Sequence, residues 1–298
     1  MSNILFSDKE KLEKIIEETG ASRSEIARKL EVPYKTIYRW LDKGTIPHKS
    51  QSISIDLLFK DYIDIRDIIY SLQKIIANPL QILQTNKTIK NNFFIEMTYN
   101  SNAIEGSRMT IKETEKIMNG EIVKGKELFE IMEVINHCNA MEYLLDVVKP
   151  GFQINKEYVL KLHSIVMYNF NNKLPGKYRT GYVNLTNTDK ALPSAQDVPL
   201  KMGKLLKSIN NYKNNILEHI ALTHHEFEAI HPFFDGNGRV GRLLMLTQLL
   251  SQSLAPAIIK IENRYAYYSA LGKADYGDFK HITQMLCNSI ARGYELFK

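Results

Sequence analysis

The sequence has few of the features that mark secreted, disulfide-bonded or membrane-spanning proteins. Its 298 residues include only two cysteines, Cys138 and Cys287, which are far apart and show no CxxC spacing, so neither a disulfide framework nor a zinc site is indicated. The most apolar stretch, 243–259, is interrupted by polar residues and falls short of a bilayer span. The N-terminus has no basic start, apolar run and small-residue cleavage site. We therefore expect a cytoplasmic protein with no membrane partner.

Charge and hydrophobic content narrow the function classes only slightly. A hydrophobic content of 44% is ordinary for a soluble globular protein, and the length allows one large domain plus a smaller one. The net charge of +6 is compatible with binding nucleotides or nucleic acid, but charge of this size is common in proteins that bind neither. The function therefore has to be inferred from the sequence motifs.

Three short helical segments near the N-terminus have helix-turn-helix spacing. The first, from about 9 to 18, ends at Thr19-Gly20. Ser22 and Glu25 form a predicted capping box at the start of the second. The third follows Pro33, and its periodicity buries Ile37, Trp40 and Leu41.

The outer face of the third segment carries side chains that suit the major groove of DNA: Lys35, Thr36, Tyr38 and Arg39. Many helix-turn-helix units contact only proteins, and neighbouring acids dilute this basic patch. DNA binding and a protein-contact role are both left open.

The rest of the chain reads as helical, which makes the fold class all-α. We place a helix-turn-helix domain at 1–48, a helical connecting segment at 49–90 and the main domain at 91–298. Helical periodicity is found at 55–76, from 79 towards 100, and at 110–118, 126–148, 155–168, 198–230, 238–250, 264–274 and 279–296. Residues 178–192 instead indicate extended chain with a turn, which predicts a short β-hairpin.

The segment 231–242, HPFFDGNGRVGR, combines residues that suit phosphate chemistry. Gly236 and Gly238 allow close backbone approach at the start of a helix, where N–H groups and the helix dipole favour an anion. Arg239 and Arg242, three residues apart, can clamp phosphate oxygens on one side of that helix.

Two more residues of this segment complete a transfer site. Asp235 supplies a carboxylate suited to Mg²⁺, and His231 can accept a proton near neutral pH. His224 and His225 lie just before it, but neither an HExxH spacing nor a cysteine completes a metal cluster, so we interpret them as surface or packing residues.

This segment resembles the signature of the Fic family, H-P-F-x-D/E-G-N-G-R-x-x-R, at all nine specified positions. The resemblance implies a Fic-type helical domain that transfers AMP from ATP to a hydroxyl of a target protein. His231 would deprotonate the hydroxyl, Asp235 would hold magnesium, and Asn237, with the neighbouring backbone, would cradle phosphates. Because residues 236–238 keep Gly-Asn-Gly, AMP transfer is favoured over the phosphate transfer of a sister branch.

The resemblance also assigns residues outside the signature. The hairpin would be the family's flap, which presents the target segment by strand pairing through Val183, Asn184 and Leu185. Tyr268 falls where the family lines the adenine side. Ser101, Glu105 and Gly106 match the inhibitory pattern S/T-x-x-x-E-G/N, so a helix around 93–106 would place Glu105 against Arg242 and hold ATP in an unproductive pose. Read without the family, Glu105 is an exposed carboxylate at a helix end.

Several alternatives stay open. The chain can instead be a transcription-regulator-like binding protein whose Fic body is idle or regulatory, or an enzyme that removes AMP from proteins with the same residues. The target protein, the modified side chain, the signal that relieves inhibition and the formation of a homodimer are not decided by the sequence.

Overall fold

The computed structural model describes residues 6–183, 191–212 and 215–297, apart from the side chains of 60 and 61, and these residues contain helices and no strand. It divides into two compact units, residues 1–68 and 69–298. The first contains α1 (Asp8–Thr19), α2 (Arg23–Lys29), α3 (Tyr34–Asp42) and α4 (Lys49–Tyr62), and α5 (Arg66–Ile75) crosses the division. The second contains α6 (Pro79–Thr85), α7 (Lys87–Ile104), α8 (Ile111–Met118), α9 (Leu128–Val147), α10 (Lys156–Val166), η1 (Asn171–Lys173), α11 (Val198–Ile209), α12 (Ile216–Ile230), α13 (Asn237–Ser251), η2 (Ile261–Asn263), α14 (Arg264–Ala274) and α15 (Lys280–Glu295).

Local sequence signals set the helices of the N-terminal unit. Ser22 and Glu25 form the predicted capping box of α2, and Gly20 ends α1 in the left-handed conformation. The inward face of α3 is buried as predicted, through Ile37, Trp40 and Leu41. The helix-turn-helix arrangement is therefore present.

A buried polar cluster joins α4 to α1 within this unit. The side chain of Lys11 is 1% exposed, and its Nζ lies 2.6 Å from Asp56 and 3.4 Å from Asp8. The hydroxyl of Ser52 donates to the same Asp8 at 2.6 Å. Because a buried ammonium needs such partners, this cluster stabilises the packing of α4 against α1. The domain boundaries placed after 48 and 90 stay predictions.

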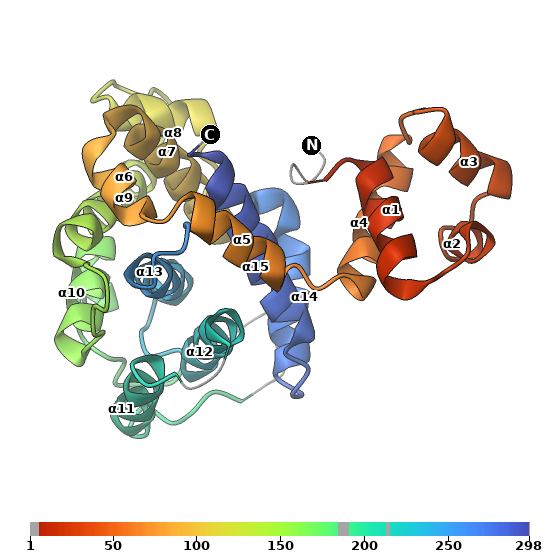
Figure 1. The fold of residues 1–298 in the computed structure, drawn as a ribbon. Coiled ribbons are helices and arrows are strands. Elements are labelled where there is room, and N and C mark those ends of the chain that lie inside the picture. Colours follow the sequence, from red (N-terminus) through yellow and green to blue (C-terminus); the bar gives the residue numbers. More distant parts are fainter. Residues whose placement is uncertain (1–5, 184–190, 213–214, 298) are drawn as a thin grey trace. The chain divides into compact units, whose positions relative to one another are not determined.

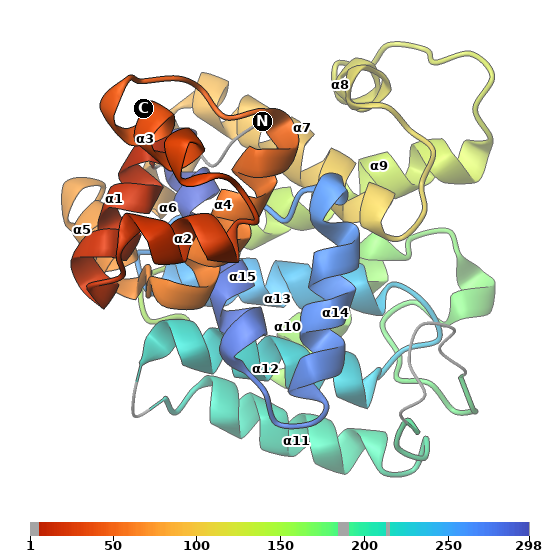
Figure 2. The same ribbon diagram turned by 90° about the vertical axis from the view of Figure 1, so that its right-hand side faces the viewer.

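Helix α13 forms the centre of the C-terminal unit. Every residue from Arg239 to Ser251 is buried, as expected for a helix that is apolar on nearly all sides. It packs against α6, α7, α9, α10 and α12, and Figure 1 looks along its axis with α10 and α12 on either side. Figure 2 shows the outer layers, in which α11 lies along α12 and α14 along α15. The first turn of α13 thus belongs to a helix that is packed in the centre of the core.

Most predicted helix positions are confirmed, and three long runs are corrected. The run from 79 towards 100 is broken at Asn86, which follows α6 and whose side chain caps α7. The run 55–76 is broken after α4, because the carboxylate of Asp64 accepts from the Arg66 N–H at 3.0 Å and starts α5. The run 198–230 is broken before α12, whose N-terminus is capped by the side chain of Asn215. Hydrophobic periodicity runs through all three breaks, so it hides them.

The predicted hairpin is not seen. Residues 184–190, including Asn184 and Leu185, lie outside the described residues, and the described flanks 178–183 and 191–192 form no strand. The hairpin therefore stays a prediction. Across the described chain, each helix is too short or too polar to span a membrane.

Candidate active site

The loop between α12 and α13 has a residue with left-handed backbone conformation at each end. His231 ends α12 with φ 48°, an unusual conformation for a residue with a side chain, and Gly236 precedes α13 with φ 75°. A Cβ on Gly236 would lie 2.8 Å from the Met167 sulfur, so glycine is required for both conformation and space. The first N–H groups of α13 have no intrahelical acceptor.

Asn237 holds this loop closed from inside. Its Oδ1 accepts from the Phe233 N–H and its Nδ2 donates to the Phe233 carbonyl, both at 2.9 Å. The side chain is buried, so it shapes the loop whose backbone faces the predicted phosphate site. Phosphate contact by Asn237 itself stays a prediction.

His163 of α10 supports the same loop from the other side. Its Nδ1 accepts from the Gly176 N–H at 2.9 Å, so its Nε2 carries the proton and donates to the Asp235 carbonyl at 3.1 Å. The ring stacks on Phe233 at 3.7 Å, and burial lowers the pKa of His163 to about 4. His163 is therefore a neutral support.

His231 is a neutral base at pH 7 in this environment. Burial lowers its pKa to about 4, and the Arg179 guanidinium acts in the same direction. The Glu228 carbonyl opposes the shift, but its geometry falls short of a hydrogen bond to the buried Nδ1. Arg179 fixes the backbone here. Its side-chain Nε donates to the His231 carbonyl at 2.8 Å, and its backbone N–H donates to the Pro232 carbonyl at 2.9 Å.

The structure brings Glu105 to Arg242, as the sequence pattern predicts. Nη2 of Arg242 lies 2.8 Å from Glu105 Oε1 and also donates to the Ser101 carbonyl, while Nε donates to the Ser101 hydroxyl at 2.9 Å. Although burial opposes the charged form, Glu105 raises the pKa of Arg242. Arg242 is 1% exposed and Glu105 32% exposed, so the carboxylate lies at the open side of the pair.

The end of α7 fits closely over the first turn of α13. Glu105 is the C-cap of α7, and Gly106 with φ 102° lets the chain leave the helix. An added Cβ on Gly238 would collide with the Glu105 carboxylate. Tyr268, predicted on the adenine side, lies beside the same helix end, with its hydroxyl 3.4 Å from the Ile104 carbonyl.

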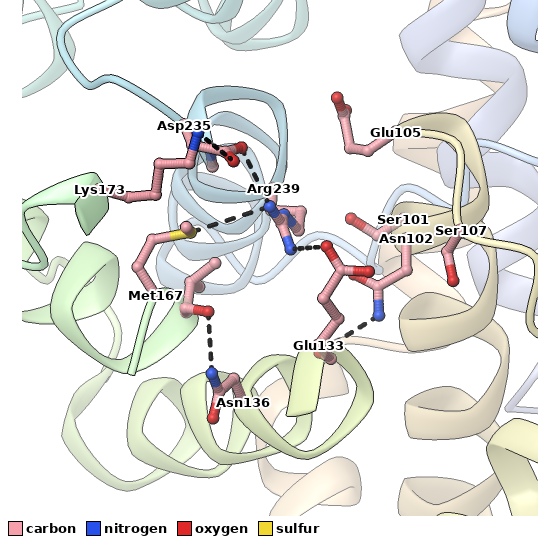
Figure 3. Close-up of polar contacts among 12 residues, drawn as sticks. Ser101, Asn102, Glu105, Ser107, Glu133, Asn136, Met167, Lys173, Asp235 and Arg239 are labelled. Atoms are coloured by element: carbon pink, nitrogen blue, oxygen red, sulfur yellow. Dashed lines mark hydrogen bonds and ion pairs between the residues drawn. The ribbon is translucent and has the colours of Figure 1, made fainter. Parts of the chain in front are cut away.

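Arg239 lies in a second cluster, which Figure 3 shows in close-up. Its Nη1 donates to Glu133 of α9 at 2.8 Å, and its Nη2 lies 3.3 Å from Asp235 Oδ1 and 3.8 Å from the Met167 sulfur. Lys173 Nζ lies 3.8 Å from the other oxygen of Asp235. Burial raises the pKa of Glu133. Carboxylates and cations thus alternate around the loop.

The donor set fits a magnesium ion bound together with phosphates. Asp235 is 43% exposed beside the loop and offers a hard carboxylate oxygen. In the part of the chain that the structure describes, no group of three metal-ligating side chains forms a complete protein cage. Mg²⁺ commonly completes its shell with waters and substrate phosphates, so one carboxylate is compatible with it.

The remaining predicted residues make other contacts, and His224 lies close to Gly241 and Arg242 of α13. His224 and His225 are buried, with Nε2 atoms 2.9 Å from the Tyr267 hydroxyl and Asp275 respectively, so both have packing partners in the described structure. Val183 is described without a strand. On the N-terminal unit, Lys35, Tyr38 and Arg39 are exposed and Thr36 is half-buried.

Four residues of the site escape the sequence reasoning. Glu133, His163, Lys173 and Arg179 come from α9, α10, η1 and the following loop, far from the signature in sequence. A buried polar residue within an apolar helix face is the one signal that could have drawn attention to His163.

Two family models match the chain. The Fic/DOC family matches residues 153–249, and the CENP-B N-terminal DNA-binding domain matches residues 6–45. The chain carries a Fic/DOC family domain. A CENP-B-type helix-turn-helix domain precedes it, which agrees with the order of the two units.

Similar proteins extend the likeness beyond the matched segment. The protein adenylyltransferase Fic of Nematostella vectensis is 29% identical over 229 residues, 75% of this chain and 53% of that protein. The Drosophila melanogaster protein of the same name is 29% identical over 212 residues, 70% of this chain and 43% of that protein. The chain thus spans about half the length of these relatives.

Solved structures share the fold. A Fic-domain signalling protein from Bacteroides thetaiotaomicron has a TM-score of 0.67 at 22% identity, covering 77% of this chain and 93% of that one. A Fic-1 fragment from C. elegans, carrying a glutamate-to-glycine substitution, also has a TM-score of 0.67, at 21% identity over 92% of this chain and 83% of that one. The all-α Fic fold is therefore established, at low sequence identity.

Proposed function

We propose that this protein is an adenylyltransferase that moves AMP from ATP to a hydroxyl side chain of a target protein, and that Glu105 restrains it. The observation that carries the proposal is the meeting of three features at one loop: a neutral His231, two arginines on the first turns of α13, and a Glu105 carboxylate bonded to Arg242. The adenylyltransferase relatives support the reaction type.

The chemistry follows from the placement of these groups. His231 accepts the proton of the target hydroxyl while the hydroxyl oxygen attacks the α-phosphorus of ATP. A phosphorus–oxygen bond forms on the target, the bond to the bridging oxygen of the β-phosphate breaks, and pyrophosphate leaves. Arg239, Arg242 and the N–H groups of α13 stabilise the charge on the phosphates. Magnesium held by Asp235 would neutralise further charge.

The restraint follows from competition for one guanidinium. Arg242 already uses Nε and Nη2 on Ser101 and Glu105, so a phosphate has to displace them to bind at this edge of the guanidinium. The Glu105 carboxylate over the first turn of α13 also repels phosphate oxygens. Release of α7 then requires a partner or ligand that binds the released state more tightly.

The test uses ATP labelled at the α- or the γ-phosphate, with magnesium and a cell lysate. We expect Glu105→Gly to incorporate the α-label far more than wild type, and His231→Ala in the Glu105→Gly background to incorporate none. Incorporation of the γ-label would point to phosphate transfer instead. Equal incorporation of the α-label by wild type and Glu105→Gly would contradict the proposed restraint by Glu105. An inactive Glu105→Gly form would favour an idle Fic body. Loss of AMP from a premodified target would indicate the reverse reaction.

The N-terminal unit supports a second function, DNA binding. The CENP-B match covers α1 to α3, and Lys35 and Arg39 are exposed on α3. We expect Lys35→Ala with Arg39→Ala in the full chain to weaken binding to duplex DNA in a gel-shift assay, because phosphate contacts supply much of the affinity. Lys9→Ala with Lys14→Ala, on α1, is the matched control for lost charge. Equal weakening by both pairs would indicate non-specific attraction only.

A further inference from the structure

Glu133 forms a second buried ion pair at the site, from a different helix than Glu105. Its Oε1 lies 2.8 Å from Nη1 of Arg239, with Glu133 19% exposed and Arg239 4% exposed (Figure 3). A guanidinium buried to this extent needs a partner, because an unpaired charge away from water is costly. Glu133 is the closer of two carboxylates beside Arg239, since Asp235 Oδ1 lies 3.3 Å from Nη2.

The two carboxylates occupy different parts of their guanidinium groups. The Nε–Nη2 edge of arginine matches two oxygens of a phosphate. In Arg242, Ser101 and Glu105 occupy both atoms of this edge.

In Arg239, Glu133 occupies Nη1 instead and leaves that edge to weaker contacts. Nε is buried with no hydrogen-bond partner among the described residues. Nη2 makes only the longer contacts to Asp235, at 3.3 Å, and to the Met167 sulfur. The edge that suits a phosphate is therefore blocked in Arg242. In Arg239 the edge is buried, is not bonded to Glu133 and makes the longer contacts to Asp235 and the Met167 sulfur.

Glu133 does not lie at a helix end, because α9 continues on both sides of it. Glu133 lies in the second turn of α9, and its backbone carbonyl accepts from Asn102 Nδ2 at 3.3 Å. One turn later, Asn136 Nδ2 donates to the carbonyls of Val166 and Tyr168, which fastens α9 to the end of α10. Glu105, by contrast, is the C-cap residue of α7 and is followed by a glycine.

We infer that Glu133 is a positioning residue for nucleotide binding, which holds Arg239 by its far nitrogen so that the Nε–Nη2 edge faces a phosphate of ATP. The inference rests on the transferase proposed above. It predicts that removing Glu133 has the opposite effect on activity to removing Glu105. Removing Glu105 frees an arginine for phosphate, whereas removing Glu133 leaves a buried arginine without the carboxylate that orients it. A second inhibitory glutamate at 133 would instead raise activity when removed.

The experiment is a double-mutant cycle in the Glu105→Gly background. Glu133→Ala, Glu133→Gln, Arg239→Ala and the double variant Glu133→Ala with Arg239→Ala are compared by the dissociation constant of ATP with magnesium and by KM and kcat for AMP transfer. We expect Glu133→Ala to weaken ATP binding about tenfold and Glu133→Gln, which keeps an acceptor oxygen, to recover part of the loss. In the Arg239→Ala background, Glu133→Ala should add nothing.

The control is Glu142→Ala, which removes another α9 carboxylate, paired with Lys90 at the surface, and should leave ATP binding unchanged. The inference is overturned if Glu133→Ala raises transfer in the otherwise wild-type chain, or if the two losses of the cycle add. An inactive Glu105→Gly parent would count against the transferase proposal alone, because the binding cycle still decides the role of Glu133.

Discussion

At the scale of single residues, the side chain of Arg179 donates to three backbone carbonyls of the described chain. Its Nε donates to His231, its Nη1 to Gly181 at 3.1 Å and its Nη2 to Pro193 at 2.6 Å. These bonds hold the left-handed backbone of His231, which carries the proposed base, and they do so from a position that is almost fully buried.

We therefore expect Arg179→Gln in the Glu105→Gly background to lower kcat for AMP transfer by about 100-fold, since small misplacements of a reacting group have effects of this size. The dissociation constant of ATP should change little, because Arg179 lies on the histidine side of the loop. Radiolabel kinetics and calorimetry measure the two quantities. Lys177→Gln, an exposed cation two residues away, is the control, and a loss confined to ATP affinity would contradict the positioning role.

Gly236 presents a test of loop conformation. Gly236→Ala should lower the free energy of unfolding by more than about 1 kcal/mol, because a left-handed alanine is strained and its Cβ meets the Met167 sulfur. Gly203→Ala is the matched control: the described structure leaves open space around this α11 residue, and alanine there should stabilise by about 0.5 to 1 kcal/mol. Urea denaturation followed by circular dichroism compares them. Equal effects would mean that Gly236 is not constrained.

At the scale of elements, the hold of α7 on Arg242 is divided between Ser101 and Glu105. Ser101→Ala removes the hydroxyl acceptor of Nε but keeps the carbonyl and the carboxylate. We expect transfer activity between those of wild type and Glu105→Gly, with ATP affinity changing in the same order. Ser107→Ala, just beyond the helix, removes a hydroxyl that faces the Met109 N–H and should behave as wild type. Ser101→Ala as inactive as wild type would assign the restraint to Glu105 alone.

The sequence predicted elements well where capping or proline chemistry marks a boundary. Pro79 begins α6 and Asn155 caps α10, both at the predicted places. The breaks at Asp64 and near Asn215 were missed, because a single polar residue within an apolar rhythm looks like part of one long helix.

The candidate site divides in the same way. The loop and the Glu105–Arg242 pair were predictable, since short motifs hold their chemistry together in sequence. Glu133 and Arg179 were not, because their roles depend on which helix or loop packs beside the motif. Such tertiary neighbours leave no periodic signal.

At the scale of the whole molecule, the two units differ in their buried histidines. His137, His163, His224 and His231 are all in the C-terminal unit, and burial lowers their pKa values to about 3, 4, 3 and 4. The one histidine of the N-terminal unit, His48, is exposed. The groups there with a lowered pKa, Glu10, Glu25 and Asp64, titrate below their usual acidic range.

This difference predicts that mild acid destabilises the C-terminal unit and leaves the stability of the N-terminal unit nearly unchanged. A histidine whose pKa is lower in the folded state binds protons mainly when unfolded, so its contribution to stability is present above pH 6.5 and is lost as pH falls towards the folded value. At pH 5 each of the four loses about 2 kcal/mol, and Glu228, whose pKa burial raises to about 8, offsets part of this loss because it is protonated in the folded state. The C-terminal unit should therefore melt at a lower temperature at pH 5 than at pH 7. Far-UV circular dichroism follows it, because most helices belong to this unit.

The N-terminal unit has its own probe in Trp40, the single tryptophan, which is buried between its helices. Between pH 7 and 5 its fluorescence transition should move little, since the lowered carboxyl pKa values of this unit lie below that window. Substituting His137 and His224 together by glutamine should shrink the acid shift seen by circular dichroism without altering the fluorescence transition. A Trp40 transition that falls in step with the dichroism signal would show that the buried histidines act on the chain as one cooperative body.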